Sequence, residues 1–281
     1  MRILITGAGG MLGHDVQRAC EAAGHEPVAL TRSSLDITDP AAVAAAVAAA
    51  APDVVVNCAA WTDVDGAESA SDEALAVNGT GAGHVAAAAH AAGAWTIHVS
   101  SDYVFDGAKS EPYLESDPVA PVSSYGRSKL AGERAVAAVA PDRHTVVRSS
   151  WLFGAHGKCF PKTILRLADE RDELTVVADQ VGCPTFTGHL AAALVELAEA
   201  PREGILHMAA AGSCSWCEFA AAIVAAAGAR CLVRPIGTAE YPTPARRPAY
   251  SVLASERDAP RLPAWDAGLS AFLSELAAVA A

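Results

Sequence analysis

Positive charge and long apolar runs are both scarce in this sequence. Its 281 residues carry 20 Lys and Arg against 32 Asp and Glu, for a formal net charge of -12. A protein that binds nucleic acid through phosphates needs a clustered basic surface, so this balance excludes that class of partner. The Ala-rich tracts at 41–51 and 86–92 are too short and too weakly apolar to span a bilayer, which takes about 20 residues. We expect neither a nucleic-acid partner nor a membrane partner.

The sequence also shows neither the apolar segment of a secretion signal nor the cysteine spacing of a disulfide framework. The chain enters a glycine turn at Gly7, without the longer apolar segment of a signal peptide, so we expect a cytoplasmic protein. The cysteines number seven and are scattered, as expected of reduced thiols in a cytosolic enzyme. Cys214 and Cys217 form a CxxC pair, but no thioredoxin-like unit or second ligand pair accompanies them. We interpret this pair as incidental.

The composition that is present predicts a globular α/β protein. Hydrophobic residues make up 52% and charged residues 19%, which excludes wholesale disorder. Residues 1–150 alternate short apolar runs with Ala-rich helical stretches, a pattern typical of βαβ units around a parallel sheet. The predicted strands here are 2–6, 26–30, 53–58, 96–100 and 144–148, and the predicted helices are 11–23, 40–50, 71–92 and 124–139.

The pattern loosens after residue 150. The predicted helices are 161–170, 188–200, 216–227 and 265–278, the predicted strands are 174–178 and 205–209, and a Pro- and Arg-rich loop covers 242–248. We expect residues 1–150 to form an NAD(P)-binding Rossmann domain with a doubly wound parallel sheet. Residues 151–281 should form mainly a smaller α/β substrate-binding lobe, partly interleaved with that sheet.

A glycine-rich turn follows the first predicted strand and opens the first predicted helix. Gly7, Gly10 and Gly13 suit a tight turn, close approach of the backbone to a pyrophosphate, and close helix–strand packing. The anion would meet the free N–H groups and the positive dipole at the start of the helix. We therefore predict that this turn binds a dinucleotide.

The end of the second predicted strand bears on the choice of cofactor. A site that prefers NAD would place Asp or Glu there to bind the ribose 2′-hydroxyl. Arg32 stands there instead, with Asp36 and Ile37 shortly after it, and a guanidinium can accept a 2′-phosphate. The pattern favours NADPH, with NADH possible, and makes these three residues cofactor-binding candidates. A solvated surface arginine is the open alternative.

Tyr125 and Lys129 lie four residues apart, on one face of a predicted helix. The spacing alone proves little, but the pair follows a strand that ends in Ser101 and Asp102, and open α/β sheets bind ligands at such strand ends. A nearby cation favours the ionised form of a phenol, so Lys129 could tune Tyr125 and hold a ribose hydroxyl. Ser101 could align a carbonyl for hydride attack. A capped helix start with a surface lysine is the alternative.

These residues, in this order, resemble the extended short-chain dehydrogenase/reductase family. The resemblance runs nearly end to end, through the segments 6–13, 57–65, 99–107, 125–133, 148–151, 179–185 and 242–248. The glycine and Tyr/Lys motifs are shared by the whole superfamily. Ser-Asp-Tyr-Val-Phe-Asp-Gly at 101–107 and Pro-Thr-Pro-Ala-Arg-Arg-Pro at 242–248 are typical of its rhamnose branch.

The resemblance implies reduction of a nucleotide sugar. NAD(P)H would give a hydride to C4 of dTDP-6-deoxy-L-lyxo-4-hexulose (dTDP-4-dehydro-β-L-rhamnose), forming dTDP-L-rhamnose. Tyr125 would protonate the new alkoxide, Lys129 would tune it and Ser101 would align the carbonyl. The residues implied to border the cofactor are Gly7, Gly10, Met11, Leu12, Gly13, Ala60, Trp61, Thr62 and Val99, besides Tyr125 and Lys129. Asp102 and Trp151 would border the sugar, although Trp151 could instead be a core residue.

The chain departs from the family pattern in three places. Ser101 stands where threonine is common, which preserves the hydroxyl, and Cys58 replaces a common alanine beside the cofactor. Some members associate through a metal held by acidic side chains, but the segment 184–189 has no carboxylate. The nine histidines show no metal-ligand spacing. We expect no metal and a monomer or homodimer.

Two other functions are compatible with the sequence. One is another nucleotide-sugar 4-ketoreductase or a 4-epimerase, and the second is a non-catalytic NADP-binding regulatory subunit resembling that of methionine adenosyltransferase. Both proposed ligands are anionic, so the excess negative charge must lie away from the cleft. We expect local positive charge at Arg32, Lys129, Arg246 and Arg247.

Overall fold

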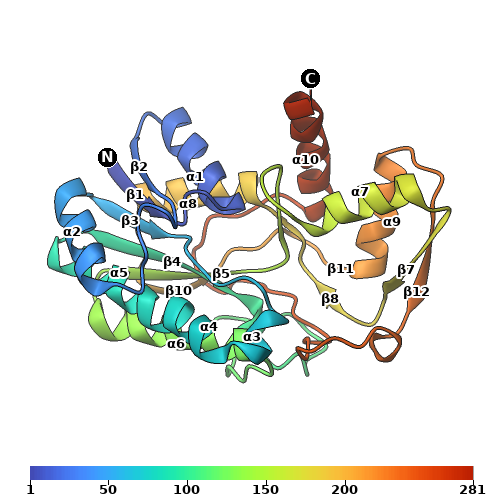
Figure 1. Ribbon diagram of the computed structural model, residues 1–281, viewed down its shortest axis with the longest axis horizontal. Coiled ribbons are helices and arrows are strands. Elements are labelled where there is room, and N and C mark those ends of the chain that lie inside the picture. The colour runs from blue at the N-terminus through green and yellow to red at the C-terminus, as the bar shows by residue number, and fades with distance from the viewer. Residues whose placement is uncertain (281) are drawn as a thin grey trace.

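A computed structural model describes residues 1–280, and its centre is a six-stranded parallel sheet (Figure 1). The strands are β1 (Arg2–Thr6), β2 (Glu26–Leu30), β3 (Val54–Asn57), β4 (Trp95–Ser101), β5 (His144–Ser149) and β10 (Gly204–His207). Their order across the sheet is β10-β5-β4-β3-β1-β2, with every pair parallel. The chain starts inside the sheet and winds outward to both edges, which confirms the predicted Rossmann-type fold.

Helices cover both faces of this sheet (Figure 1). They are α1 (Met11–Ala22), α2 (Pro40–Ala50), α3 (Gly66–Ser69), α4 (Ser71–Leu75), α5 (Ala82–Ala91), α6 (Ser124–Val139) and α8 (Thr187–Glu199). Ile3 and Ile5 of β1 share a core with α1 and α8, whereas Leu4 shares the opposite core with α2 and α5. This alternation is the two-residue period of a strand that is buried on both faces. We call the sheet and these helices the sheet half.

A second core lies beside the sheet half, and we call the elements around it the outer lobe. Its helices are α7 (Phe160–Glu170), α9 (Trp216–Ala226) and α10 (Trp265–Ala280), and its strands are β6 (Leu152–Phe153), β7 (Glu173–Val177), β8 (Val181–Gly182), β9 (Thr185–Phe186), β11 (Cys214–Ser215) and β12 (Leu232–Ile236). Phe153 lies at the centre of the core, against Phe186, Phe219 and Phe272. The chain leaves the outer lobe for α8 and β10 and then returns, so the two parts are interleaved.

Capping residues fix the starts of two helices of the sheet half. Asp39 accepts hydrogen bonds from the backbone N–H groups of Ala41 and Ala42, at 2.9 and 3.1 Å, and Pro40 occupies the first turn of α2. Ser123 accepts a hydrogen bond from the backbone N–H of Gly126 at 3.1 Å and so starts α6. These side chains set the helix boundaries that the sequence predicts.

Several segments differ from the sequence prediction, among them the two-residue strands β6, β8, β9 and β11, which were not predicted. The helix predicted at 71–92 is interrupted by a π-helical turn over Ala76–Gly81. The helix α3 is only four residues long, too short for a helical period to be visible in the sequence. The strand β12 contains Arg234 and Pro235 and is largely exposed, so it lacks the apolar pattern of a buried strand.

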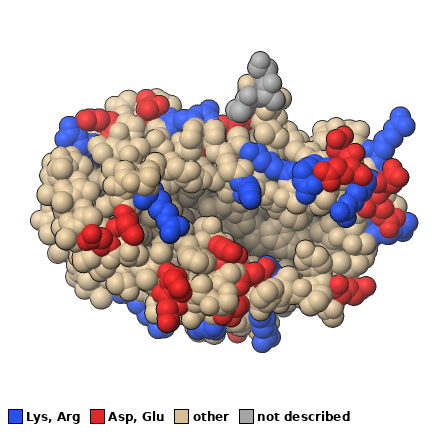
Figure 2. Space-filling model, in the orientation of Figure 1, with Lys and Arg blue, Asp and Glu red and all other residues tan. Residues whose placement is uncertain are grey.

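Within residues 1–280, no helix combines the length and the apolar character needed to cross a membrane. The space-filling view shows a hollow over the middle of one face, with uncharged atoms on its floor and side chains of both charges around its rim (Figure 2). The negative net charge is therefore not spread evenly over this face.

Candidate active site

The glycine loop between β1 and α1 is packed too closely for a side chain at two positions. Gly7 has a φ of +66°, and a Cβ there would lie 2.6 Å from the backbone nitrogen of Ala59. A Cβ on Gly13 would lie 2.4 Å from the carbonyl oxygen of Gly7. Gly10 is the N-cap of α1, and no side chain of the described residues caps this end.

The start of α1 therefore offers backbone N–H groups, those of Met11 and Leu12 among them, that have no acceptor one turn earlier in the helix. Bare N–H groups at a helix N-terminus bind anions. The close-packed glycines bring the backbone to the surface of this turn, which fits the pyrophosphate of a dinucleotide.

The three candidates after β2 have different surroundings. Arg32 is exposed, in a turn closed by the hydrogen bond from the backbone N–H of Ser34 to the carbonyl oxygen of Thr31, 3.0 Å. Asp36 accepts hydrogen bonds from the N–H and the hydroxyl of Thr38, and these bonds hold the pKa of its carboxyl below the usual range. Ile37 is buried. Only Arg32 presents a side-chain donor to a ligand at this position.

The loop after β3, which contains Ala60, Trp61 and Thr62, is held by a residue that the sequence reasoning missed. Asn78 accepts a hydrogen bond from the backbone N–H of Trp61 at 2.8 Å and donates one to its carbonyl oxygen at 3.1 Å. Asn78 also donates to the hydroxyl of Ser128 in α6 at 2.9 Å. The π-helical turn positions this amide between the loop and α6.

The Tyr/Lys pair lies in the first two turns of α6, beside the carboxyl end of β4. Lys129 is buried, and its Nζ donates to the carbonyl oxygen of Val99 at 2.7 Å. Ser101, at the end of β4, donates to Oδ1 of Asp102 at 2.9 Å. Its hydroxyl also lowers the pKa of Tyr125. The structure thus brings Ser101 close to Tyr125, with Lys129 one helical turn away.

Burial dominates the electrostatics of this group. It raises the pKa of Tyr125 to about 12, together with the charge of Asp102 and against the effect of Ser101. Burial lowers the pKa of Lys129 to about 8, against the charges of Glu133 and Cys58. Tyr125 therefore stays protonated at neutral pH, the state required of a proton donor.

Asp102 is 1% exposed, and only one of its two carboxylate oxygens has a hydrogen-bond partner within residues 1–280. Its Oδ1 accepts the hydrogen bond from Ser101, while its Oδ2 has no partner among the described residues. Burial raises the pKa of this carboxyl to about 6, against the lowering effects of the Ser251 and Ser101 hydroxyls. A buried oxygen without a partner carries a free-energy cost, and a ligand hydroxyl at this position would remove it.

Trp151 is held in a strained conformation by the outer lobe. Its φ of +47° lies in the left-handed region, which costs a large side chain about 1–2 kcal/mol. The indole stacks on Trp216, with centroids 3.5 Å apart and planes at 3°. A Cβ on Gly182 would lie 2.4 Å from Cε2 of Trp151. Trp216, which belongs to the CxxC segment, was not predicted as a site residue.

Two further acidic side chains tie α6 to its neighbours, Glu133 of α6 itself and Glu68 of α3. Glu133 is buried, accepts hydrogen bonds from Nε and Nη2 of Arg148 at 2.9 and 2.7 Å, and also accepts one from Ser100 at 2.6 Å. Glu68 of α3 accepts hydrogen bonds from the N–H and the hydroxyl of Ser124, at 2.7 and 2.9 Å. The helix that carries Tyr125 is therefore fixed at its start by Glu68 and against the sheet by Glu133.

A cavity of about 530 Å³ lies between the loop 242–248 and the segments around Asp106 and Gln180. Arg246 lines it and is exposed, as expected for a residue that meets an anionic ligand. Arg247 also lines the cavity, but its guanidinium forms a two-pronged ion pair with Asp65, at 3.0 and 2.8 Å. The expectation of free positive charge at Arg247 is wrong, because Asp65 neutralises it and anchors the loop.

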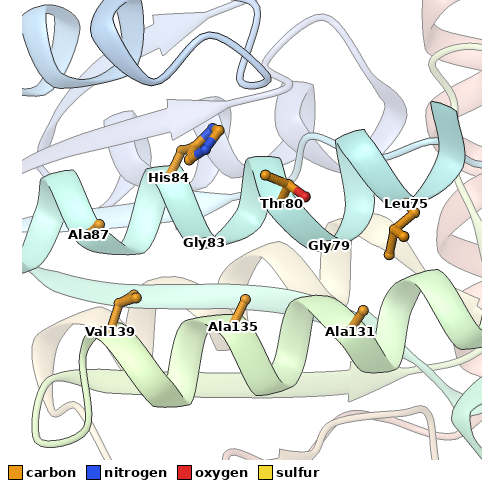
Figure 3. A pocket seen from close by; sticks show the side chains of 9 residues that line it. All are labelled: Leu75, Gly79, Thr80, Gly83, His84, Ala87, Ala131, Ala135 and Val139. Carbon is orange, nitrogen blue, oxygen red and sulfur yellow. The ribbon is translucent and has the colours of Figure 1, made fainter. Parts of the chain in front are cut away.

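A second cavity, of about 440 Å³, lies on the far side of the sheet half between α5 and α6. Small residues line most of it, with Leu75 and Val139 at its ends (Figure 3). It contains none of the predicted site residues.

The CxxC pair has no sign of redox activation. Burial raises the pKa of Cys214 to about 12 and also raises that of Cys217. A reactive thiol needs a lowered pKa, so the two side chains are suited to packing at the start of α9.

Three comparisons with known proteins bear on this site. A family described as RmlD substrate binding domain matches residues 1–278. The chain is 47% identical to dTDP-4-dehydrorhamnose reductase of Burkholderia thailandensis over 91% of both chains. It is 41% identical to spore coat polysaccharide biosynthesis protein SpsK of Bacillus subtilis, over 98% of this chain and 97% of that one. The crystal structure of dTDP-4-dehydrorhamnose reductase from Bacillus anthracis in complex with NADP superimposes with a TM-score of 0.94, at 38% identity over 98% and 99% of the two chains.

Proposed function

The chain belongs to the family described as RmlD substrate binding domain, and from that membership we propose that it is an NAD(P)H-dependent dTDP-4-dehydrorhamnose reductase. It would reduce the C4 carbonyl of dTDP-4-dehydro-β-L-rhamnose to give dTDP-L-rhamnose. The observation that carries this proposal is the grouping of Ser101 at the end of β4 with Tyr125 and the buried Lys129 of α6, whose Nζ donates to the carbonyl oxygen of Val99 in the same strand. The membership also confirms the resemblance to extended short-chain dehydrogenases/reductases.

On the cofactor side, Gly7, Gly10 and Gly13 with the first N–H groups of α1 would hold the pyrophosphate. Arg32 would bind the 2′-phosphate that distinguishes NADPH from NADH, because its guanidinium is exposed at the end of β2. The relative from Bacillus anthracis that was solved with NADP supports this choice. NADPH supplies the hydride when bound.

The loop with Ala60, Trp61 and Thr62 would border the other side of the cofactor. Asn78 fixes this loop against α6, and α6 carries Lys129. The ammonium group of Lys129, already bonded to Val99, would use a remaining donor for the nicotinamide ribose. Cofactor and proton donor would then be positioned by one continuous set of hydrogen bonds.

On the substrate side, Ser101 and Tyr125 would both donate hydrogen bonds to the carbonyl oxygen at C4. The developing negative charge on that oxygen strengthens these bonds in the transition state, which is the origin of their catalytic effect. Tyr125 would then transfer its proton to the new alkoxide. Its raised pKa, about 12, keeps the proton in place until that moment.

Asp102 and Trp151 would select the sugar. The free Oδ2 of Asp102 can accept a hydrogen bond from a sugar hydroxyl, and the Trp151 indole offers a flat apolar face. Arg246 in the neighbouring cavity would face the diphosphate. Both substrates are charged nucleotides, so we place the reaction in the cytoplasm. We propose that the protein acts as a monomer or a homodimer.

The test is NADPH oxidation with dTDP-4-keto-6-deoxy-L-hexulose, with the product identified by NMR. We expect one NADPH consumed per keto sugar and dTDP-L-rhamnose as the product. An epimerised sugar formed without NADPH consumption would assign a 4-epimerase. Binding of NADPH without any reduction, combined with an effect on a partner enzyme's activity, would assign a regulatory subunit.

A further inference from the structure

Three side chains with metal-ligand atoms lie together outside the proposed active site. His14 and Asp15 are neighbours in α1, and His156 lies in the loop between β6 and α7. One ligand atom from each lies within 4.8 Å of the other two. The rings of His14 and His156 stack, with centroids 3.5 Å apart and planes at 27°. The cluster joins the sheet half to the loop that leads into the outer lobe.

Two buried atoms of this cluster have no hydrogen-bond partner among residues 1–280. They are Oδ2 of Asp15, whose side chain is 3% exposed, and Nδ1 of His14. The nearest donors are engaged elsewhere. Thr187 donates to the carbonyl oxygen of Phe153 at 3.2 Å, and Arg18 is bonded to Glu275 and lies 4.0 Å from Oδ1 of Asp15.

An unpaired carboxylate oxygen in a buried position is costly unless a proton or a cation satisfies it. Arg18 lies near this carboxyl, 4.0 Å from Oδ1, yet Oδ2 of Asp15 and Nδ1 of His14 keep no hydrogen-bond partner among residues 1–280. A bound cation would satisfy both atoms. Neither atom belongs to the residues proposed to bind cofactor and sugar.

Two imidazoles and one carboxylate form a ligand set typical of zinc and related transition metals, whereas Mg²⁺ and Ca²⁺ prefer oxygen ligands. We propose that His14, Asp15 and His156 bind a divalent ion of the zinc class, with water as the fourth ligand. Bonds of about 2.0–2.1 Å place tetrahedral ligand atoms roughly 3.4 Å apart. The two imidazoles must splay to reach that spacing, and both are partly exposed and can rotate.

The ion ties the loop 154–159 to α1, directly after the glycine loop. Gly154 of this loop already packs there, since a Cβ on it would lie 2.9 Å from Cγ of Met11. Metal binding that requires ligands from two parts of a fold stabilises the folded state. Metal binding should therefore strengthen the junction between the sheet half and the outer lobe without entering the reaction.

The test is calorimetric titration of zinc sulfate into full-length protein that has been treated with a chelator. We expect one ion per chain and a higher Tm in the presence of zinc. His156→Ala should weaken binding by more than about 100-fold, because loss of an outer-shell partner alone costs about 10–100-fold. His90→Ala is the matched control, since His90 is exposed on α5 and lies 3.8 Å from Asp142. It should keep the wild-type affinity.

Four results would overturn the proposal, and three of them concern zinc itself. The first is equal zinc affinity in the wild type and His156→Ala, and the second is no binding to the wild type. The third is one ion per two chains together with zinc-dependent dimerisation in sedimentation. Substitution by Co²⁺ separates the ligand types, because thiolate ligation gives an intense near-ultraviolet band. That band would assign the ion to cysteines and contradict the His14–Asp15–His156 site.

Discussion

The sheet half and the outer lobe hold the proposed site by different means. In the sheet half the backbone forms the cofactor side, through the glycine loop, the strand ends and the carbonyl oxygen of Val99, and the Asn78 and Glu133 side chains support it. In the outer lobe, side chains far apart in the sequence hold one another, as Trp216 holds Trp151. Arg247 and Asp65 do the same across the cleft. A backbone site is specified by short motifs, whereas a side-chain site is specified only by tertiary packing.

The largest effect is expected in the sheet half, at the proton donor. Tyr125→Phe removes the phenolic proton and should lower kcat by about 10²–10⁴-fold, because general acid catalysis contributes that much. The Kd for NADPH should barely change. Steady-state assays with the keto sugar, with NADPH binding followed by fluorescence, measure both quantities. Tyr103→Phe is the control, since its ring meets that of Tyr125 edge-on at 5.5 Å. Equal turnover in the two variants would refute the assignment.

A substitution at Asp102 is expected to stabilise the folded protein. The pKa of Asp102 rises to about 6, so the folded state holds this proton more tightly than the unfolded state. That contribution to folding is complete below about pH 4 and is lost as the pH rises through 6. Asp102→Asn should therefore raise the free energy of unfolding by up to about 3 kcal/mol at pH 8, and less towards pH 4.

Urea unfolding at pH 4, 6 and 8 measures this difference. Asp106→Asn is an informative control, because hydrogen bonds from Tyr113 and Ala108 lower the pKa of Asp106. Its substitution should destabilise the protein at pH 8, the reverse of Asp102→Asn. If both substitutions destabilised the protein at pH 8, the prediction would be wrong, because the folded state would then stabilise the ionised form of Asp102.

A smaller effect is expected from the aromatic pair of the outer lobe. Trp216→Ala removes the surface on which Trp151 stacks, and such pairs contribute about 0.5–1.5 kcal/mol beyond their buried area. The KM for the keto sugar should rise about tenfold, with the KM for NADPH unchanged. Trp216→Phe should recover most of the loss. An unchanged KM in the alanine variant would mean that Trp151 needs no support or does not meet the sugar.

An effect of similar size, on the cofactor and not on the sugar, is expected at the exposed end of β2. Arg32→Ser should raise the KM for NADPH about tenfold and leave the KM for NADH unchanged, because a hydrogen bond to a charged group contributes about 1.5–3 kcal/mol. Arg166→Ser, on the exposed face of α7, is the charge-matched control. Equal KM values for NADPH in the wild type and Arg32→Ser would identify Arg32 as a surface residue.

The comparison of the two parts also explains what the sequence could predict. The bounds of β1, β2, α2 and α6 agree with the prediction to the residue. Local signals set these bounds: apolar strands, the Asp39–Pro40 cap and the Ser123 cap. The family resemblance was readable for the same reason, since its most specific motifs are short and contiguous.

The remaining parts of the site depend on contacts between residues far apart in the sequence. Asn78 was missed because a π-helical turn leaves no periodic signal in the sequence. Trp216 was missed because the residue on which it stacks, Trp151, lies 65 positions earlier in the chain. Arg247 was expected to contribute positive charge because both ligands are anionic, and its partner Asp65 lies 182 positions away in the sequence and meets it only in the folded chain. Ion pairs between residues that are distant in the sequence can be identified only once the packing of the fold is known.

The division between the two parts is tested most directly by titrating NADPH and dTDP-L-rhamnose separately into Arg32→Ser and Trp216→Ala. Arg32→Ser should weaken NADPH binding about tenfold and leave binding of the sugar nucleotide unchanged. Trp216→Ala should weaken the sugar nucleotide about tenfold and leave NADPH unchanged. Loss of both ligands in either variant would contradict the separate construction of the cofactor side and the sugar side.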